Sequence, residues 1–313
     1  METTKHYSVL LEESIDALNV KKDGIYVDGT LGRAGHSSVL LKLIPNGHLY
    51  SVDRDIAAIN ESKARLDKVG SNYTLIHSNF GNLKNALKEL GVNEIDGLIL
   101  DLGVSSPQLD EAQRGFSYRF DAPLDMRMDQ SSPLSAYDVV NDYSFENLMF
   151  MMKNYGEENY AKQIARKIEK YRETKKIETT FELVEIIKSA LPSKVLNTKG
   201  HPAKKVFQAI RIEVNNELDE LKQVLIDALS ILKVGGRISV ISFQSLEDRI
   251  VKETFNQYGK AKAVDKRIPM LPGTNEEPPY KIISRKPILP SEEELEENNR
   301  SHSAKLRVIE RIR

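Results

Sequence analysis

Three glycines at three-residue spacing separate a short apolar run from a helical segment in Ile25–Ser38 (IYVDGTLGRAGHSS). Gly29, Gly32 and Gly35 follow Asp28, the acid that ends the apolar run. Glycine adopts backbone angles that other residues rarely adopt, so this pattern predicts a strand that ends in a tight turn. The helix after the turn then presents unpaired amide donors, as in the nucleotide sites of parallel α/β sheets. Because the spacing is not G-x-G-x-x-G, it argues against an NAD site.

The first hundred residues alternate between short apolar runs and amphipathic segments, which is typical of a doubly wound, mostly parallel α/β sheet. We expect strands at residues 25–28, 48–52, 73–77 and 97–101 and helices near residues 35–43, 56–68 and 83–90. The pattern returns after residue 206 with one long helix that ends at Gly235-Gly236. The remaining predicted elements are strands over residues 237–243, 280–284 and 304–312 and a helix over residues 246–258.

The alternation stops between the two halves of this sheet. Residues 103–142 are polar and aperiodic, and residues 145–155, 158–172 and 181–191 show helical patterns. Thr179 and Glu182 form a capping-box sequence at the start of the third helix. We expect three segments. Residues 1–107 form the first part of the sheet and residues 206–313 form the second part. Residues 108–205 form a loop plus a helical insertion domain for substrate recognition. Residues 260–279 form a second polar stretch.

The 313-residue chain has a net charge of −1, contains no Cys and has six scattered His residues. The lack of Cys excludes disulfides, thiolate metal sites and cysteine nucleophiles, and it favours a reducing cytoplasm. The His residues show no ligand-like spacing, so we expect no metal site held by the protein. No apolar run approaches about 18 residues, so we expect no membrane span. Nucleic-acid binding would have to come from local basic patches.

Two carboxylates end predicted strands at the sheet edge where open α/β folds bind ligands. Asp53 ends the second strand, where it would accept hydrogen bonds from both ribose hydroxyls of an adenosine ligand; the alternative is a helix N-cap, which Asp55 also suits. Asp101 ends the fourth strand, where it would contact a substrate amine or the charged end of a cofactor; the alternative is a turn-forming Asp. Phe80, after the third strand, suits either an adenine pocket or the core.

One polar loop alternates cations with aromatic rings, the combination that recognises single-stranded nucleic acid. Its arginines are Arg114, Arg119 and Arg127, and its rings are Phe116, Tyr118 and Phe120. The alternative is an ordinary loop that folds its rings into the core. Two further basic clusters comprise Lys199, His201, Lys204, Lys205 and Arg211, and Arg300, Lys305, Arg307, Arg311 and Arg313. We expect the acidic residues 292–297 to form a solvated helix start.

Eight short motifs occur in an order that resembles the bacterial RsmH (MraW) family. They are His6–Leu11, Asp28–Ser37, Asp101–Ser106, Gln113–Ser117, Pro123–Met128, His201–Ala203, Phe207–Ile212 and Ser303–Arg307. This family methylates the N4 amine of a decoding-centre cytosine in 16S rRNA with S-adenosylmethionine. The resemblance covers nearly the whole chain and implies a class I methyltransferase sheet with an all-helical domain inserted after the fourth strand. Where family members usually have His, this chain has Gln244, so we expect no histidine general base there.

The resemblance also implies roles for single residues. The cofactor contacts that it carries over are Ala34, Gly35, His36, Asp53, Phe80, Asp101 and Gln108. Asp101 and the loop that contains Ser105 and Ser106 are the catalytic candidates, because an acceptor at the cytosine N–H groups would make the amine more nucleophilic. This loop lacks an aromatic residue, so the ring that stacks on the base is expected to be Phe116, Tyr118 or Phe120.

The implied partner is 16S rRNA within the small ribosomal subunit, with no metal ion and no membrane. The expected RNA contacts are Arg114, Phe116, Tyr118, Arg119, Phe120, Arg127, Lys204, Lys205, Arg211, Lys305 and Arg307. The sequence leaves open whether the protein is a monomer or a homodimer. Two rival interpretations are an NAD-dependent oxidoreductase, whose glycine fingerprint is missing, and a non-catalytic ribosome-assembly factor, which would need only the basic patches.

Overall fold

The computed structural model describes residues 8–198, 200–260 and 277–313. It divides into two compact units, Met1–Gly103 with Leu218–Arg313, and Val104–Glu217. From the sequence we expected the divisions after residues 107 and 205. The second division falls later because α11 (Lys204–Val214) buries its apolar face in the core of the second unit. His6, Tyr7, Lys199 and most of the polar stretch 260–279 lie outside the described residues.

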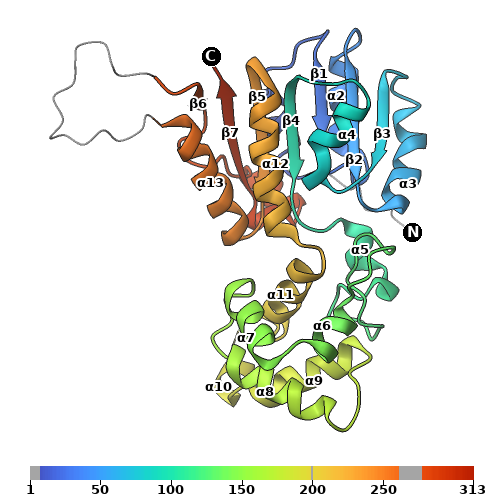
Figure 1. The fold of residues 1–313 in the computed structure, drawn as a ribbon, viewed down its shortest axis with the longest axis vertical. Helices are drawn as coiled ribbons and strands as arrows, with labels where there is room; N and C mark the ends of the chain where they lie inside the picture. Colours follow the sequence, from blue (N-terminus) through green and yellow to red (C-terminus); the bar gives the residue numbers. More distant parts are fainter. Residues whose placement is uncertain (1–7, 199, 261–276) are drawn as a thin grey trace, which may run out of the picture. The chain divides into compact units, whose positions relative to one another are not determined.

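Seven strands form one sheet in the first unit, in the order β3-β2-β1-β4-β5-β7-β6 (Figure 1). They are β1 (Ile25–Asp28), β2 (His48–Asp53), β3 (Tyr73–His77), β4 (Ile95–Asp101), β5 (Leu232–Ser242), β6 (Tyr280–Ile282) and β7 (Lys305–Arg311). The first five pair in parallel, whereas β7 is antiparallel to β5 and β6. Strands β1 to β3 extend the sheet to one side and β4 onward extend it to the other, so the strand order reverses between β1 and β4. Ligands are expected at the carboxyl ends of these two strands. This order is that of the class I methyltransferases and confirms the predicted fold class.

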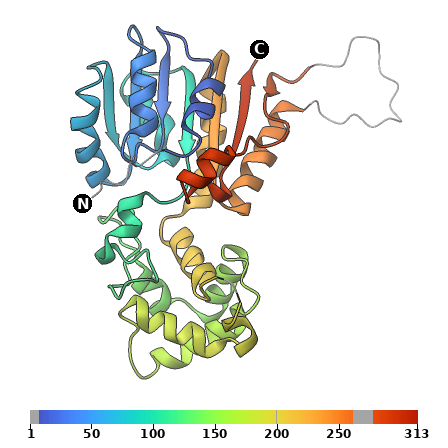
Figure 2. The ribbon, with the colours of Figure 1, turned by 180° about the vertical axis from the view of Figure 1, so that it is seen from behind.

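Helices cover both faces of the sheet (Figures 1 and 2). On one face lie α1 (Leu11–Ala17), α2 (Gly35–Leu43) and α3 (Ile56–Leu66), and on the other α4 (Leu83–Glu89), α12 (Glu217–Ile231) and α13 (Ser245–Gly259). The central strand β4 is buried at every position before Asp101, as expected for a parallel strand covered on both sides. The short elements η1 (Phe80–Asn82), α14 (Glu292–Glu297) and η3 (Ser301–Ser303) complete the first unit. No helix in the described ranges is long and apolar enough to cross a membrane.

The second unit consists of helices and loops. Its elements are α5 (Ser106–Asp110), η2 (Ala112–Arg114), α6 (Ala136–Asp142), α7 (Phe145–Asn154), α8 (Ala161–Arg172), α9 (Thr180–Ala190), α10 (Ser193–Leu196) and α11. The predicted capping box starts α9, where the Thr179 hydroxyl accepts a hydrogen bond from the Glu182 amide at 3.3 Å. α5 and α6 lie in the stretch that we expected to be aperiodic, because both helices are too short to show a clear period.

The prediction of one long helix after residue 206 is wrong. The structure has two helices there, α11 and α12, which are separated at Asn215-Asn216. Asn216 adopts a left-handed backbone with φ of 49°, a conformation that asparagine tolerates better than most residues. Apolar residues continue at helical spacing through the break, so periodicity alone does not reveal it.

The predicted role of Gly235-Gly236 as a helix end is also wrong. Strand β5 starts at Leu232 and contains both glycines. A Cβ atom at Gly236 would lie 2.8 Å from the carbonyl oxygen of Asp96, so glycine there permits the close approach of neighbouring β4.

Candidate functional site

The glycine turn after β1 is held by the buried carboxylate of Asp28. Its Oδ1 accepts a hydrogen bond from the Thr30 amide at 3.0 Å, and its Oδ2 accepts one from the Ser37 hydroxyl at 2.7 Å. Gly32 and Ala34 both have left-handed backbones, with φ of 49° and 57°. A side chain at Gly35 would collide with Ser8, since a Cβ atom there would lie 1.7 Å from its Oγ. The turn therefore places the start of α2 at the carboxyl edge of the sheet.

Asp53 lies at the end of β2, and the N-cap alternative does not apply to it. Asp55 caps α3 by accepting a hydrogen bond from the Ala57 amide at 3.1 Å. Asp53 instead accepts the Gly32 amide on Oδ2 and the Asp55 amide on Oδ1, both at 2.9 Å. Burial raises the pKa of Asp53, while these two amides oppose the shift. Each carboxylate oxygen has a second lone pair, so the carboxylate can still accept hydroxyl groups of a ligand.

Buried His36 and half-buried Asp101 lie close together, and each has a buried side-chain atom with unmet hydrogen-bonding capacity. Asp101 Oδ2 lies 3.9 Å from His36 Nδ1, while Asp101 Oδ1 and His36 Nε2 have no hydrogen-bond partner among the described residues. Burial raises the pKa of Asp101 to about 8, with smaller contributions from the carboxylates of Asp28, Glu247 and Glu294. Burial also lowers the pKa of His36 to about 4.

At neutral pH the imidazole is therefore neutral, and the two groups do not form a charged pair. Buried polar atoms are nearly always satisfied, so two unsatisfied atoms at a ligand-binding edge indicate groups that a ligand completes. The backbone of Asp101 is fixed, because its amide donates to Thr30 Oγ1 at 2.7 Å.

Phe80 lies in η1, beside the glycine turn. Its ring is half-buried, and the Arg54 guanidinium lies 5.3 Å from the ring centroid. Arg54 also pairs with Glu220 of α12. A Cβ atom at Gly29 would lie 3.7 Å from that of Phe80, which places this residue near the turn. The proposed contact with adenine stays a prediction.

Sequence reasoning gave no role at this edge to Phe243 and Glu247. After β5, the amides of Phe243 and Gln244 donate to Glu247 Oε2 at 2.9 and 3.0 Å. The Phe243 ring lies near Gly103, where a Cβ atom would be 3.7 Å from the ring. Glu247 is the third residue of α13, and its carboxylate accepts the amide of the residue before the helix. An acid at this position of a predicted helix is the sequence signal that would have identified it.

The acidic residues of α14 are not simply a solvated helix start. Glu294 Oε1 accepts a hydrogen bond from the Leu10 amide at 2.9 Å. Burial raises the pKa of Glu294. Leu10 is buried and left-handed, with φ of 49°, so this carboxylate fixes the start of α1.

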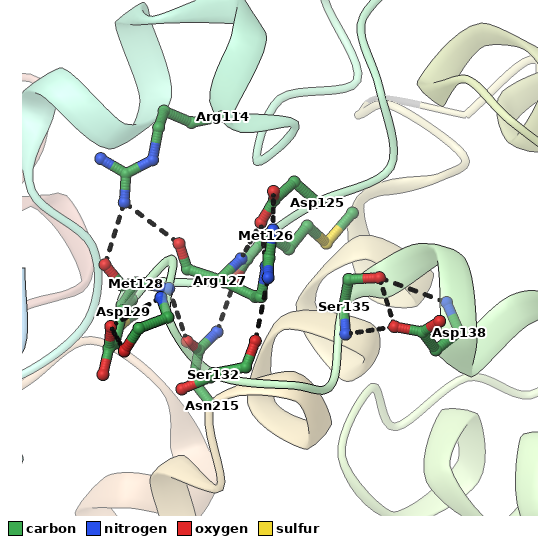
Figure 3. Close-up of polar contacts among 11 residues, drawn as sticks. Arg114, Asp125, Met126, Arg127, Met128, Asp129, Ser132, Ser135, Asp138 and Asn215 are labelled. Carbon is green, nitrogen blue, oxygen red and sulfur yellow. Dashed lines mark hydrogen bonds and ion pairs between the residues drawn. The ribbon is translucent and has the colours of Figure 1, made fainter.

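In the second unit, two predicted RNA-binding arginines brace a loop (Figure 3). Arg114 is 7% exposed, and its Nη2 donates to the carbonyls of Arg127 and Met128 at 3.1 and 3.0 Å. Arg127 forms a two-pronged ion pair with Asp125, at 3.0 and 2.8 Å. Although burial opposes the shift, the bonds from Arg127 hold the pKa of Asp125 below its usual range. These contacts use the arginines within the protein.

The same loop is tied to the end of α11 by Asn215 (Figure 3). Its Oδ1 accepts the Met128 amide and its Nδ2 donates to the Met126 carbonyl, both at 2.8 Å. Met126 is fully buried with a left-handed backbone, φ 58°, which is rare for a residue other than glycine. The loop is therefore a rigid part of the second unit.

The three predicted stacking rings differ in exposure. Phe116 is buried in the core of the second unit, so stacking on RNA is excluded for it. Tyr118 stacks on His201, with ring centroids 4.2 Å apart and planes 8° apart. Phe120 is 45% exposed, and its neighbour Arg119 is exposed as well. Of these residues, Phe120 and Arg119 retain exposed surfaces that suit RNA contact.

Other predicted contacts also have partners within the protein. Arg211 pairs with Glu217 at 2.7 Å, and Arg307 pairs with Asp248 at 2.6 Å. Lys305 lies 3.7 Å from the same aspartate. We therefore no longer expect Arg114, Phe116, Arg127, Arg211 and Arg307 to contact RNA.

Lys204 and Lys205 are exposed, although Lys205 also donates to the Glu157 carbonyl at 2.9 Å. Ser105 and Gln108 lie at the start of α5, where Gln108 Oε1 accepts the Ser105 amide at 3.1 Å. The side chain of Ser106 lies outside the described part of the structure. Among the described residues, no three carboxylate or imidazole groups gather as a metal site would require.

Comparison with known families gives one match, to the MraW methylase family, over residues 3–312. Similar solved structures cover almost the whole chain at low identity. An rRNA methylase from Streptococcus thermophilus has 14% identity and a TM-score of 0.40, and covers 98% of this chain and 99% of its own. A candidate rRNA methylase from Clostridium thermocellum has 14% identity and a TM-score of 0.45, with 98% and 100% coverage.

A protein of Streptococcus mutans, solved in complex with S-adenosylhomocysteine, has 13% identity and a TM-score of 0.42, with 98% and 99% coverage. Similarities this distant assign no substrate.

Proposed function

The chain belongs to the MraW methylase family, and we propose that it methylates the N4 amine of a decoding-centre cytosine in 16S rRNA, within the assembled small ribosomal subunit. It is a methyltransferase that uses S-adenosylmethionine. This cofactor supplies a methyl group on a sulfonium, which is already a strong donor, so the protein mainly has to align the acceptor. A ribosomal substrate would place the reaction in the cytoplasm.

The residues at the carboxyl edge of the sheet fit this cofactor. Asp53 has spare acceptor capacity for the ribose hydroxyls, next to the turn that its Gly32 contact stabilises. Ala34 and Gly35 start α2, whose first amides point out of the turn. The unsatisfied Nε2 of His36 would be completed by the charged, methionine end of the ligand. An NAD-dependent enzyme would share the ribose acid but not the spacing of these glycines.

The observation that carries the proposed reaction is the unsatisfied Oδ1 of Asp101 at the end of β4. Cytosine N4 is a poor nucleophile, because its lone pair is delocalised into the ring. An acceptor at its N–H group increases the electron density on the nitrogen. The amine must also lose one proton once it carries a methyl group, and ionised Asp101 would accept that proton at Oδ1. In the ligand-free protein a pKa of about 8 keeps this carboxyl mostly protonated at neutral pH. The positive charge of the bound sulfonium would favour the ionised form, and the loss of that charge on methyl transfer would favour the protonated form again.

We also propose Phe243 as the ring that stacks on the cytosine. It follows β5 at the same edge as Asp101 and lies beside Gly103. Phe116 is buried in the core and Tyr118 already stacks on His201, whereas Phe243 is half-buried at this edge. The base must leave its stack to reach the methyl group, which costs a few kcal/mol and favours a structured subunit that already extrudes it.

The test is transfer of a labelled methyl group to purified, unmethylated small subunits, followed by nuclease digestion and identification of the nucleoside. We expect N4-methylcytidine at one position and little product on short unstructured RNA. Asp101→Asn should lower kcat about 100-fold, because the acceptor for the proton is lost. Methylation of another base or atom, or no transfer at all, would refute the proposed reaction.

Two alanine variants separate the candidate rings. Phe243→Ala should reduce methyl transfer about tenfold or more while S-adenosylhomocysteine binds normally, since stacking is worth about 1–3 kcal/mol per base. Phe120→Ala is the matched control at an exposed ring of the second unit. If Phe120→Ala is the more damaging change, Phe243 is not the stacking residue.

A further inference from the structure

Helix α8 exposes a row of cations on the side opposite its buried stripe. Its buried residues Ala161, Ile164, Ala165 and Ile168 contribute to the core of the second unit. The exposed side carries Lys162, Arg166, Lys167 and Lys170, which we call the α8 basic face. Lys162, Arg166 and Lys170 lie at successive i, i+4 positions, about 6 Å apart along the helix axis.

No ion pair joins a cation of the α8 basic face to a carboxylate among the described residues. The guanidinium of Arg166 lies 6.0 Å from the centroid of the Phe145 ring. Arg127 and Arg211 of the same unit, in contrast, are both paired with acids. Like charges at i, i+4 spacing destabilise a helix by about 0.2–0.5 kcal/mol per pair, so an unpaired row favours the approach of a polyanion.

The surroundings of the row favour a nucleic acid over other polyanionic partners. None of the exposed large apolar side chains in the described residues lies on α8. A membrane-binding helix needs an exposed apolar face, and the centre of a protein interface is apolar and poor in charge. A row of lysine and arginine on a helix that exposes no large apolar side chain matches a sugar-phosphate backbone.

We propose that the α8 basic face binds phosphates of the RNA substrate and thereby holds it on the second unit. This inference rests on the proposed function, because it takes rRNA as the substrate. The contacts would be to the backbone and would carry no base specificity, so they would contribute affinity and orientation rather than the choice of cytosine.

The test compares two full-length charge-reversal variants. One is Lys162→Glu/Arg166→Glu/Lys170→Glu, and the control is Lys68→Glu/Lys88→Glu/Lys252→Glu, which changes the net charge equally at exposed positions of the first unit. The probe is a decoding-centre fragment of 16S rRNA, and its affinity is measured by fluorescence anisotropy over a range of salt concentrations. S-adenosylhomocysteine affinity and thermal unfolding establish that each variant is folded.

We expect the α8 variant to bind RNA at least tenfold more weakly, and the control to change affinity less than threefold. The slope of log K against log salt should fall by about 2 for the α8 variant, since each phosphate contact contributes about 0.7–0.9 to it. The neutral variant Lys162→Gln/Arg166→Gln/Lys170→Gln should show the same direction with a smaller effect, which separates lost attraction from added repulsion.

Equal losses in the two charge-reversal variants, or an unchanged salt slope, would overturn the inference. So would an α8 variant that loses binding to intact subunits but not to the RNA fragment, because its partner would then be a ribosomal protein. Failure of the wild-type protein to methylate cytosine would refute the proposed function without changing these binding results, so the two failures are distinguishable.

Discussion

The carboxyl edge of the sheet and the loop that follows Arg114 are both rich in charged side chains, but they use them differently. At the edge, Asp101 Oδ1 and His36 Nε2 are buried without a partner among the described residues. In the loop, Arg114 donates to two carbonyls and Arg127 is held by Asp125. Unmet hydrogen-bonding capacity at the edge indicates a place for a ligand, whereas the two arginines of the loop donate to groups of the protein and form a framework.

The largest effect should come from the edge. Asp53→Ala should weaken binding of S-adenosylhomocysteine about 100-fold, because it removes the acceptor for ribose and the bond that fixes Gly32. Isothermal titration calorimetry measures this directly. Asp55→Ala is the matched control, since it should cost about 1 kcal/mol of stability through the lost N-cap while leaving the affinity nearly unchanged. Equal losses of affinity would mean that Asp53 is only structural.

A second pair of variants tests the framework role of the loop. Arg114→Met should lower the free energy of unfolding by about 2–3 kcal/mol, because it leaves the carbonyls of Arg127 and Met128 without their donor. Arg119→Met changes an exposed arginine of the same loop and should cost less than about 0.5 kcal/mol, but it should weaken RNA binding. Urea unfolding followed by circular dichroism measures both. The comparison fails if Arg114→Met reduces RNA affinity without loss of stability.

The smallest effect concerns pH. Asp101 has a pKa of about 8 in the folded protein and about 3.8 when unfolded. Between these two pH values the folded state binds more protons than the unfolded state, so stability falls as the pH rises and the fall ends above pH 8. His36, with a pKa of about 4 instead of 6.5, has the opposite effect, because its contribution is lost as the pH falls from 6.5 toward 4. The two oppose each other below pH 6.5, and only the effect of Asp101 continues above it.

Without cofactor, the wild type should therefore lose up to about 2 kcal/mol relative to Asp101→Asn between pH 6.5 and 8. Urea unfolding of both proteins at several pH values gives this difference. The carboxylates of Asp28, Glu247 and Glu294, which raise the pKa of Asp101, are present in both proteins. A difference that stays constant with pH would show that Asp101 is already ionised.

The sequence was most informative where a strand ends. Asp53 and Asp101 could be placed because the carboxyl ends of parallel strands meet at one edge, and the glycine turn has few backbone solutions. The arginines could not be assigned in this way. Arg127 finds its acid two residues away, but Arg307 finds Asp248 at a separation of 59 residues, and only the fold brings that pair together. The break at Asn215-Asn216 was missed because both helices have apolar faces.

The bond between Leu10 and Glu294 joins residues 284 positions apart in the chain. During synthesis, this segment leaves the ribosome long before α14 exists, so its final anchor forms only after α14 has been made. Because Ser8 lies against the start of α2, this end of the cofactor site would be among the last parts to mature. A nascent chain would then carry the glycine turn early but gain a fully ordered site only after α14 has emerged.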